Sequence, residues 1–146
     1  MDEAALLLGY RFSVRHTVIA GRQLGRELGF PTANMKLCAR TPLRNGVYAV
    51  RLRRADGRIY DGVASLGLRP TIEDDGIQLL ETHIFDFSAD LYGEACTVSF
   101  FDFIRDEQKF DGLDALVLAI SRDQDHARSR LRSVEPVSNL DAAMNF

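Results

Sequence analysis

The feature that most constrains the fold is a hairpin pattern in the first half of the chain. Apolar and polar side chains alternate along residues 46–55 (GVYAVRLRRA), and residues 58–66 (RIYDGVASL) form a second strand-like run. Alternation with a period of two is typical of a strand that buries one face. The Asp56-Gly57 pair between the two runs is a favoured two-residue turn. These residues therefore predict an antiparallel hairpin.

Further strand-like runs and a glycine-rich segment surround the hairpin. The runs are residues 12–20 (FSVRHTVIA), 78–87 (QLLETHIFDF) and 94–104 (EACTVSFFDFI). Residues 21–29 (GRQLGRELG) hold three glycines in nine positions, which interrupts regular structure, and residues 67–76 are predicted to be a loop. Five or six strands with short connections and no helices between them predict an antiparallel sheet closed into a small barrel.

Helical periodicity begins only at Leu113. Apolar residues from there to Leu131 fall mostly at helical spacing. Asp111 is placed to cap the N-terminus, and Asp114 lies in the first turn. The sequence predicts one amphipathic helix of about five turns packed against the barrel. No element is predicted after Pro136.

Length and composition are those of one ordinary globular domain. The chain has 146 residues, of which 46% are apolar and 27% charged. No apolar run approaches the ~20 residues that cross a bilayer, so no membrane association is expected. Acids rather than basic residues follow Met1, so secretion is not expected. The two cysteines, Cys38 and Cys96, suggest no disulfide framework, and a cytoplasmic location is the expectation.

Charge is distributed unevenly along the chain. The net charge is −3, but residues 9–54 contain ten Lys/Arg and one acid, Glu27, a net +9, which leaves −12 on the remainder. A basic third in an acidic protein favours an anionic partner for that third. The alternative is that these arginines pair with acids elsewhere in the fold. A small nucleic-acid-binding barrel would also use such a patch, but the acidic remainder argues against it.

The glycine-rich segment is a candidate phosphate loop. Gly21 and Gly25 let the backbone approach an anion, and Arg26 beside them supplies a guanidinium group. The pattern lacks the GK[ST] of a Walker loop and is not GxGxxG. An ordinary hairpin loop is the alternative.

Thr32 and Asn34 are candidate metal ligands. Pro31 before them favours an extended segment or a turn. On an extended segment, side chains two residues apart face the same side. Hydroxyl and amide oxygens suit Mg²⁺ when substrate phosphates supply further charge. The alternative is that Thr32 caps a turn and Asn34 bonds to the backbone.

Glu81 is the most conspicuous carboxylate, because it lies in the apolar run LLETHIFDF. A carboxylate in such surroundings can act as a general base. His83 lies on the same strand face, but two ligands without a third are weak evidence for a metal site. The alternatives are that Glu81 pairs with an arginine and that His83 is a barrel residue.

Aromatic residues near Arg105 form a weaker candidate. With the guanidinium group, an aromatic cluster here could stack on a flat heterocycle. Its members are Phe100, Phe101, Phe103 and Phe110. Core packing is the alternative for these phenylalanines.

Five blocks, in order along the chain, resemble riboflavin kinases. They are GRQLGRELGFPTANMKL (21–37) with its PTAN signature, NGVYAV (45–50), SLGLRPTI (65–72), LETHIFDFSADLYGE (80–94) and FIRDEQKFDGLDAL (103–116). The resemblance covers about residues 10–132 and implies a single domain over 1–146 with a tail at 133–146. The fold that it implies is all-β, a six-stranded antiparallel Greek-key barrel with a C-terminal helix.

The resemblance also implies a reaction, the transfer of the ATP γ-phosphoryl group to the 5′-hydroxyl of riboflavin to give FMN and ADP. It implies Mg²⁺ as the cofactor, held with the nucleotide by Thr32 and Asn34, and Glu81 as the catalytic base. The other binding residues that it implies are Gly21, Gly25 and Arg26 over the phosphates, Pro31 of the PTAN signature, and Arg105 to Phe110 in a flap over the flavin. The expected partners are riboflavin, FMN, ATP and ADP, bound by a monomer that binds no nucleic acid.

Two further features of the sequence leave alternatives. His16 stands where the family commonly has glycine, two residues before Val18, so a catalytically impaired flavin- or nucleotide-binding module is the alternative function. Residues 4–12 (AALLLGYRF) resemble the junction that precedes the kinase in bifunctional FAD synthetases, yet no nucleotidyltransferase motif is present. The sequence fits a stand-alone kinase and a module of such a protein equally, and FAD synthesis is not expected.

Overall fold

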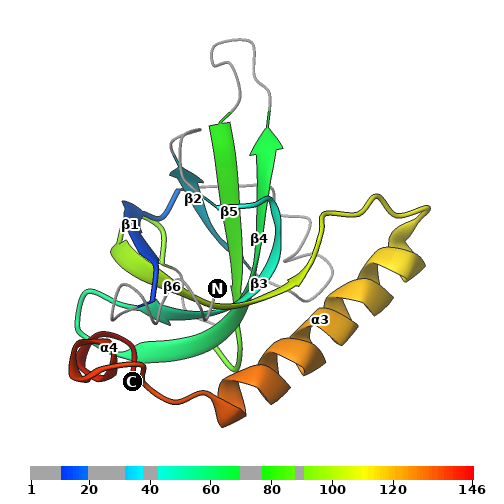
Figure 1. Cartoon of the computed structure of the whole chain (residues 1–146). Coiled ribbons are helices and arrows are strands. Elements are labelled where there is room, and N and C mark those ends of the chain that lie inside the picture. Colours follow the sequence, from blue (N-terminus) through cyan, green and yellow to red (C-terminus); the bar gives the residue numbers. More distant parts are fainter. Residues whose placement is uncertain (1–10, 20–31, 38–42, 70–76, 88–90) are drawn as a thin grey trace.

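One six-stranded antiparallel sheet dominates the part of the chain that the computed structural model describes, residues 11–19, 32–37, 43–69, 77–87 and 91–146 (Figure 1). The strands are β1 (Ser13–Thr17), β2 (Thr32–Leu37), β3 (Gly46–Arg53), β4 (Ile59–Arg69), β5 (Ile77–Ile84) and β6 (Ala95–Arg105). The helices α3 (Leu113–Ser133) and α4 (Asn139–Asn145) follow β6.

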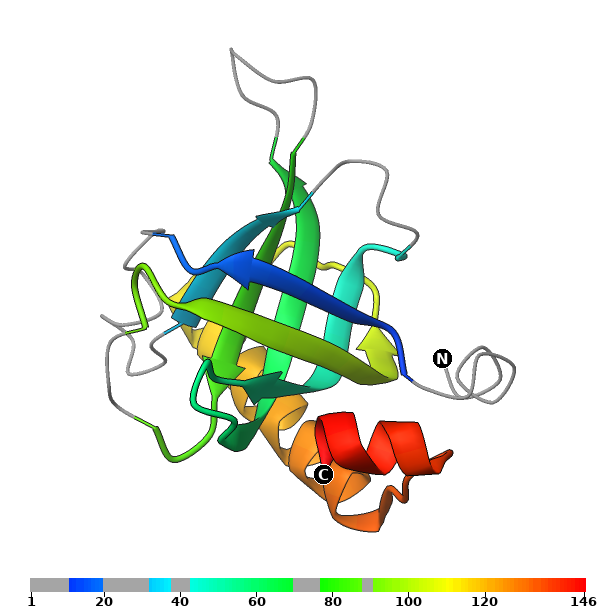
Figure 2. The ribbon, with the colours of Figure 1, turned by 90° about the vertical axis from the view of Figure 1, so that its left-hand side faces the viewer.

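The strand order β1-β6-β3-β4-β5-β2 contains a Greek key, because β3, β4 and β5 are consecutive neighbours and β6 returns beside β3. The two ends of this order meet where the Ile19 N–H donates to the Asn34 carbonyl at 2.8 Å. In Figure 2 the sheet curls until β1 and β2 approach one another. The barrel is therefore nearly closed, and the predicted six-stranded Greek-key barrel with a C-terminal helix is confirmed.

The predicted hairpin is confirmed as β3 and β4, which pair from Gly46 opposite Leu66 to Arg53 opposite Ile59. Gly57 in its turn has φ of 92°, a conformation that glycine adopts without a steric penalty. The loop predicted at residues 67–76 was wrong at its start, because residues 67–69 continue β4 and pair with residues 77–79 of β5.

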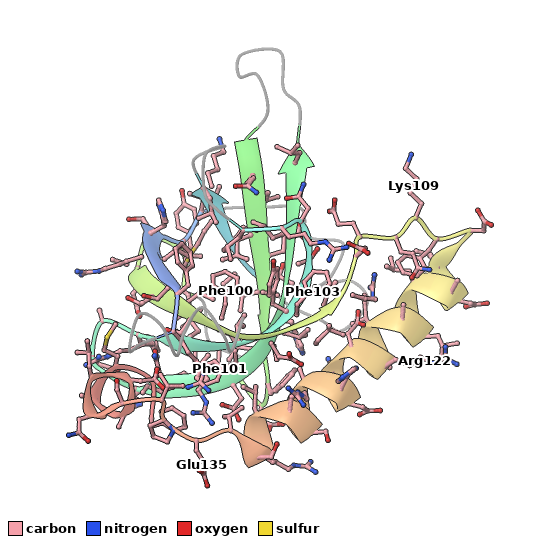
Figure 3. The ribbon with its side chains drawn as sticks, viewed as in Figure 1. Phe100, Phe101, Phe103, Lys109, Arg122 and Glu135 are labelled. Carbon is pink, nitrogen blue, oxygen red and sulfur yellow. The ribbon has the colours of Figure 1, made fainter. Side chains whose placement is uncertain are left out.

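Alternate residues of the strands fill the barrel, as their hydrophobic alternation predicted. The largest fully buried side chains inside include Tyr48, Phe100, Met35, Leu52, Leu66 and Leu80. A second apolar cluster lies between the outer face of the barrel and α3, and it consists of Val47, Ala49, Val63, Phe85, Phe101, Ala127 and Leu131. Ala49 pairs with Asp102 and Val50 pairs with Phe100, so Phe101 is an extra residue, or β-bulge, on β6. Phe100 lies in the inner cluster and Phe101 in the outer one (Figure 3).

Helix α3 is confirmed and begins at Leu113, where the helical periodicity begins, but its predicted cap is wrong. The N-cap is Gly112 and no side chain caps the helix, so Asp111 does not cap it. Buried residues occur only from Asp123 onward, whereas Leu113 and Leu118 are exposed, and the first turns stand away from the strands in Figure 1. Among the described residues, no helix has the length and apolar character needed to span a membrane.

Helix α4 was not predicted, although the sequence carries its signal. Ser138 is the N-cap, and its hydroxyl accepts a hydrogen bond from the Asp141 N–H at 3.1 Å. A serine followed three residues later by an acid is an N-terminal capping pattern. The helix is short, and tertiary contacts hold it in place.

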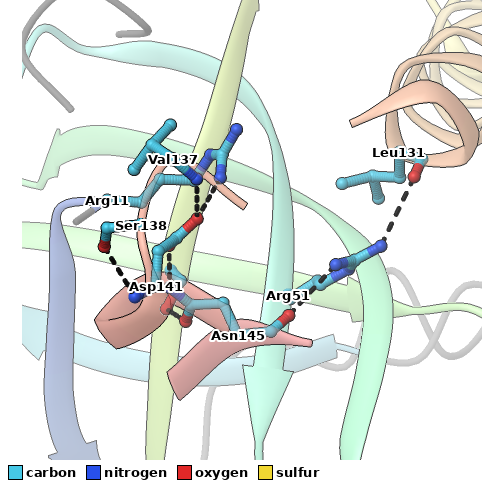
Figure 4. Close-up of polar contacts among 8 residues, drawn as sticks. Arg11, Arg51, Leu131, Val137, Ser138, Asp141 and Asn145 are labelled. Atoms are coloured by element: carbon cyan, nitrogen blue, oxygen red, sulfur yellow. Dashed lines mark hydrogen bonds and ion pairs between the residues drawn. The ribbon is translucent and has the colours of Figure 1, made fainter. Parts of the chain in front are cut away.

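Those contacts form a cluster that we call the polar clasp: Arg11, Arg51, Ser99, Asp141 and Asn145. Figure 4 shows the contacts of Arg11, Arg51, Asp141 and Asn145. Asp141 is fully buried; it accepts from Arg11, from the Val137 N–H at 3.0 Å and from the Asn145 amide at 2.7 Å. Ser99 on β6 bonds to the Asn145 side chain, and Arg51 on β3 donates to the Asn145 carbonyl at 3.0 Å.

Aromatic rings complete the clasp. The Arg11 guanidinium lies 4.4 Å from the centre of the Phe101 ring, and the Arg51 guanidinium lies 4.5 Å from that of Phe146. Stacking on a ring covers the faces of a guanidinium group that hydrogen bonds do not reach. The clasp thus joins Arg11, two residues before β1, to helix α4 and Phe146.

A further ion pair lies at the turn end of the β3–β4 hairpin, directly after β3. Arg54 donates to both carboxylate oxygens of Glu94, at 3.0 and 2.9 Å. These bonds lower the pKa of Glu94 to about 2 and raise the pKa of Arg54. Burial, and then the neighbouring Glu94, raises the pKa of Cys96 to about 11, so this thiol stays protonated at neutral pH.

Candidate active site

The candidate catalytic residues lie on one row of the barrel's outer face. Asn34 on β2 is opposite Glu81 on β5, and Glu81 is opposite Ser65 on β4. Ser65 is opposite Val47 on β3, and Val47 is opposite Arg105 on β6. Directly opposite residues of paired strands share a face of the sheet. Segments far apart in the sequence therefore place Asn34 and Glu81 side by side, with Arg105 at the other end of the same row.

Backbone hydrogen bonds decide how close Glu81 lies to each neighbour. The Asn34 carbonyl bonds to Ile19, so the backbone polar groups of Asn34 point away from β5. Asn34 and Glu81 are thus a non-hydrogen-bonded pair, in which the Cα atoms lie about 4.5 Å apart and the side chains are closest. On the other side of β5, the Phe85 N–H donates to the Asp61 carbonyl. Hydrogen-bonded pairs recur at every second residue of an antiparallel ladder, so Ser65 and Glu81, four residues further along each strand, are also such a pair. Their Cα atoms are therefore about 5.5 Å apart.

Asn34 has an unusual environment for an outward-facing residue. Its exposed fraction is 4%, and its amide donates weakly to the Thr32 carbonyl and hydroxyl at 3.4 and 3.5 Å. Its Oδ1 is buried and accepts no hydrogen bond from the described part of the chain. Thr32 and Asn34 thus meet as predicted, and the backbone contact predicted as the alternative is present as well. Leaving a buried acceptor unsatisfied is costly, so Oδ1 is available for a cation or a donor that comes with a ligand.

The oxygens of Thr32 and Asn34 are suitable ligands for Mg²⁺, but they are too few to hold the ion by themselves. A hydroxyl and an amide oxygen are hard ligands of the type that Mg²⁺ accepts. Within the described ranges, no group of three or more His, Cys, Asp or Glu side chains could hold a metal by itself. A magnesium ion at Thr32 and Asn34 would therefore depend on further oxygens, such as those of nucleotide phosphates.

His83 adjoins Glu81 and faces Thr32 across the β2–β5 pair. Its ring lies 5.8 Å from that of Phe85 in a T-shaped contact, and Phe85 belongs to the apolar cluster beneath α3. The Arg128 guanidinium of α3 covers Phe85, with 4.2 Å from its carbon to the ring centre. The β5 end of the site is in this way attached to the helix.

Arg105 is at the far end of the row, three strand spacings from Glu81, which is about 14 Å measured along the curved sheet. It donates to both carboxylate oxygens of Asp123 on α3, at 2.9 and 2.8 Å. Its guanidinium carbon lies 5.5 Å from the centre of the Phe110 ring. The two residues predicted for the flap therefore contact each other, and their contact with a ligand stays a prediction.

The structure corrects two interpretations. Phe100 and Phe101 are buried in the core, so these two rings are not available to stack on a heterocycle, and the half-buried Phe103 packs against the core. Several arginines of the basic segment pair with acids of the fold, as the alternative interpretation required. The pairs are Arg11–Asp141, Arg44–Asp106, Arg51–Asp61 and Arg54–Glu94.

The structure says little about the remaining predicted residues. Gly21, Gly25, Arg26 and Pro31 lie outside the described residues. His16 is exposed on β1, opposite Cys96.

Sequence reasoning missed Ser65 and Asp123. The position of Ser65 beside Glu81 follows only from the register of the β4–β5 pair. Asp123 had a signal, because it interrupts the stripe of Leu116, Ile120, Ala127 and Leu131 at a position that faces the barrel. An acid on the apolar stripe of a helix needs a buried partner.

The comparisons with known proteins agree with this geometry. Residues 8–131 match the family model of riboflavin kinase (Flavokinase). The chain belongs to the riboflavin kinase family. It is 44% identical over 127 residues to the bifunctional riboflavin kinase/FMN adenylyltransferase of Haemophilus influenzae, a match that covers 87% of this chain and 41% of that protein. The chain thus spans about two fifths of the length of such relatives.

Two solved structures share the fold. The riboflavin kinase of Trypanosoma brucei superposes with a TM-score of 0.62 at 26% identity, covering 87% of this chain and 83% of that one. A crystal structure from Streptococcus pneumoniae described as a macrolide-efflux protein superposes with a TM-score of 0.77 at 39% identity, covering 86% of this chain and 41% of that one.

Proposed function

We propose that this chain transfers the γ-phosphoryl group of ATP to the 5′-hydroxyl of riboflavin, giving FMN and ADP. The observation that carries the proposal is the pairing of Glu81 with Asn34 across β2 and β5, in a chain of the riboflavin kinase family. Phosphoryl transfer needs positioned groups and charge neutralisation more than covalent catalysis.

Glu81 is the proposed general base. The riboflavin hydroxyl oxygen forms a bond to the γ-phosphorus while the bond from that phosphorus to the oxygen of ADP breaks, and the Glu81 carboxylate accepts the hydroxyl proton. The position of Glu81 beside Asn34 supports this role, because a base must be held within hydrogen-bond reach of the proton that it removes.

Thr32 and Asn34 are the proposed ligands for Mg²⁺ with ATP. When bound, the metal neutralises charge on the transferred phosphoryl group. The buried, unsatisfied Oδ1 of Asn34 supports this assignment. Gly21, Gly25, Arg26 and Pro31 complete the proposed nucleotide site, and Arg105 to Phe110 form the proposed cover over the flavin.

We also propose a cytoplasmic monomer without nucleic-acid binding. The net charge of −3 and the ion pairing of basic-segment arginines within the fold support the last point.

The decisive test is incubation of the purified protein with riboflavin, ATP and MgCl₂, followed by chromatographic separation of the flavins. FMN that appears only with both ATP and metal, and no FAD, is the expected result. Binding of riboflavin or ATP without any FMN would contradict the kinase and favour the impaired binding module. Replacing His16 by Gly would then show whether that residue causes the loss.

A further inference from the structure

Asp123 is a buried acid on the barrel-facing side of α3. Its side chain is 10% exposed, and both of its oxygens accept hydrogen bonds from Arg105. A carboxylate that is removed from water costs free energy unless a cation and hydrogen bonds compensate it, and a two-point contact with arginine is the strongest such arrangement. The pair fixes the end of β6 to the middle of α3.

Arg105 also holds the segment that begins directly after it. Its remaining terminal nitrogen donates to the Asp106 carbonyl at 3.0 Å, and its guanidinium carbon lies 5.5 Å from the Phe110 ring centre. Every nitrogen of the guanidinium therefore has an acceptor, and the plane of the group is set. The Asp106 carbonyl accepts from the edge of this group, and the Phe110 ring lies near its carbon.

A second ion pair joins the same two elements. Arg130 of α3 bonds to Asp102 of β6 at 2.8 Å, with side chains 45% and 22% exposed. Asp102 lies three residues before Arg105 within β6. The chain therefore offers a matched control: two β6–α3 ion pairs, of which the Arg105–Asp123 pair includes the residue that bonds to Asp106 and lies against Phe110.

We propose that Asp123 is a positioning residue for the flavin side of the reaction. By orienting Arg105, it holds residues 106–110 in the conformation that receives the isoalloxazine ring. This inference rests on the proposed function, which assigns Arg105 to Phe110 to the flavin. A group held in place before substrate arrives costs less ordering on binding, so loss of the orientation reduces flavin affinity rather than nucleotide affinity.

The test compares Asp123→Asn with Asp102→Asn in the whole chain. Asparagine keeps the size of the side chain and removes the charge and one of the two acceptor oxygens. We expect Asp123→Asn to raise KM for riboflavin about 10- to 100-fold while KM for ATP stays within about twofold. Asp102→Asn should leave both values within about twofold, and Asp123→Glu, which retains two acceptors, should recover most of the loss.

Riboflavin fluorescence supplies a binding measurement that does not depend on turnover. Equal riboflavin affinities for the Asp123→Asn and Asp102→Asn proteins would overturn the inference, and so would an equal loss of riboflavin and ATP affinity in Asp123→Asn. If the parent protein binds riboflavin but makes no FMN, the proposed function fails while the comparison of affinities still tests Asp123. Should Asp123→Asn not fold, Arg105→Lys, which keeps the charge without the two-point contact, must show the same selective loss.

Discussion

Asn34 and Asn145 are both buried asparagines, but their surroundings differ in a way that separates a site from a scaffold. The Asn145 side chain bonds to Ser99 and donates to Asp141, so each end of its amide has a partner within the polar clasp. The Asn34 amide makes two long contacts to Thr32, and its Oδ1 accepts nothing from the described residues. An unsatisfied buried atom does not mark a ligand site by itself, because Arg11 Nε in the clasp also lacks a hydrogen-bond partner among the described residues. Asn34 differs in that it lies opposite Glu81 and beside Thr32.

The difference extends to the residues around each asparagine. The clasp is enclosed between β1, β3, β6 and α4, and arginines stack on its aromatic rings. Helix α3 packs mainly on β3, β4 and β6, and it reaches the β5 end of the site through Arg128, which lies over Phe85. The clasp is thus sealed by the fold, whereas Asn34 of the candidate site keeps a buried acceptor without a partner among the described residues.

The largest effect is expected from breaking the clasp. Asp141→Ala should lower the free energy of unfolding by about 3–5 kcal/mol, because it leaves the Arg11 charge buried without a partner. Urea unfolding measures this change, and Asp125→Ala, at an exposed position of α3, is the control. A loss no larger than that of the control would show that the clasp does not hold the fold together.

Glu81→Gln should have the next largest effect, and on a different property. Turnover should fall by about 10² or more, because glutamine cannot accept the hydroxyl proton, while the affinities for riboflavin and ATP and the unfolding midpoint change little. Steady-state kinetics and ligand titration measure the two. Glu135→Gln, at an exposed position after α3, is the control (Figure 3). Parallel losses of rate and binding would make Glu81 a structural residue.

Thr32→Ala should weaken binding of the magnesium–ATP complex by about tenfold, the size expected when one hydrogen bond or ligand to a charged partner is lost. Calorimetric titration with and without MgCl₂ would show whether the loss depends on the metal. Thr97→Ala on β6 is a control of the same type, because Thr97 is also half-buried. Unchanged affinity in Thr32→Ala would remove that residue from the nucleotide site.

The smallest effect is expected on the pH dependence of stability, through the Arg54–Glu94 ion pair. Since Arg54 holds the pKa of Glu94 at about 2, below its ordinary value of 4.5, the pair contributes stability that is fully present above about pH 5 and is lost as pH falls toward 2. The difference in unfolding midpoint between the parent and Glu94→Gln should therefore be largest near pH 7 and shrink on acidification. A difference that stays constant from pH 7 to pH 3 would contradict this assignment.

The sequence predicted the barrel well because alternation along strands and the Asp56-Gly57 turn are local signals. It also singled out Thr32, Asn34 and Glu81 as candidates, and their roles stay predictions. It did not show that Asn34 and Glu81 adjoin, because that depends on the register of strands separated by more than forty residues. Nor did it place Arg105 against Asp123, because that contact depends on how a helix docks. Helix α4 was missed since its stability comes from tertiary contacts rather than from length or propensity.

The most direct test of the contrast between scaffold and site is a paired measurement on Asn34→Ala and Asn145→Ala. For each protein, the free energy of unfolding and the affinity for magnesium–ATP are determined under the same conditions. We predict that Asn34→Ala loses nucleotide affinity with little loss of stability, and that Asn145→Ala loses stability while its folded fraction binds nucleotide normally. If Asn34→Ala were as destabilised as Asn145→Ala and still bound nucleotide with the parent affinity, the unsatisfied Oδ1 would not mark a ligand site.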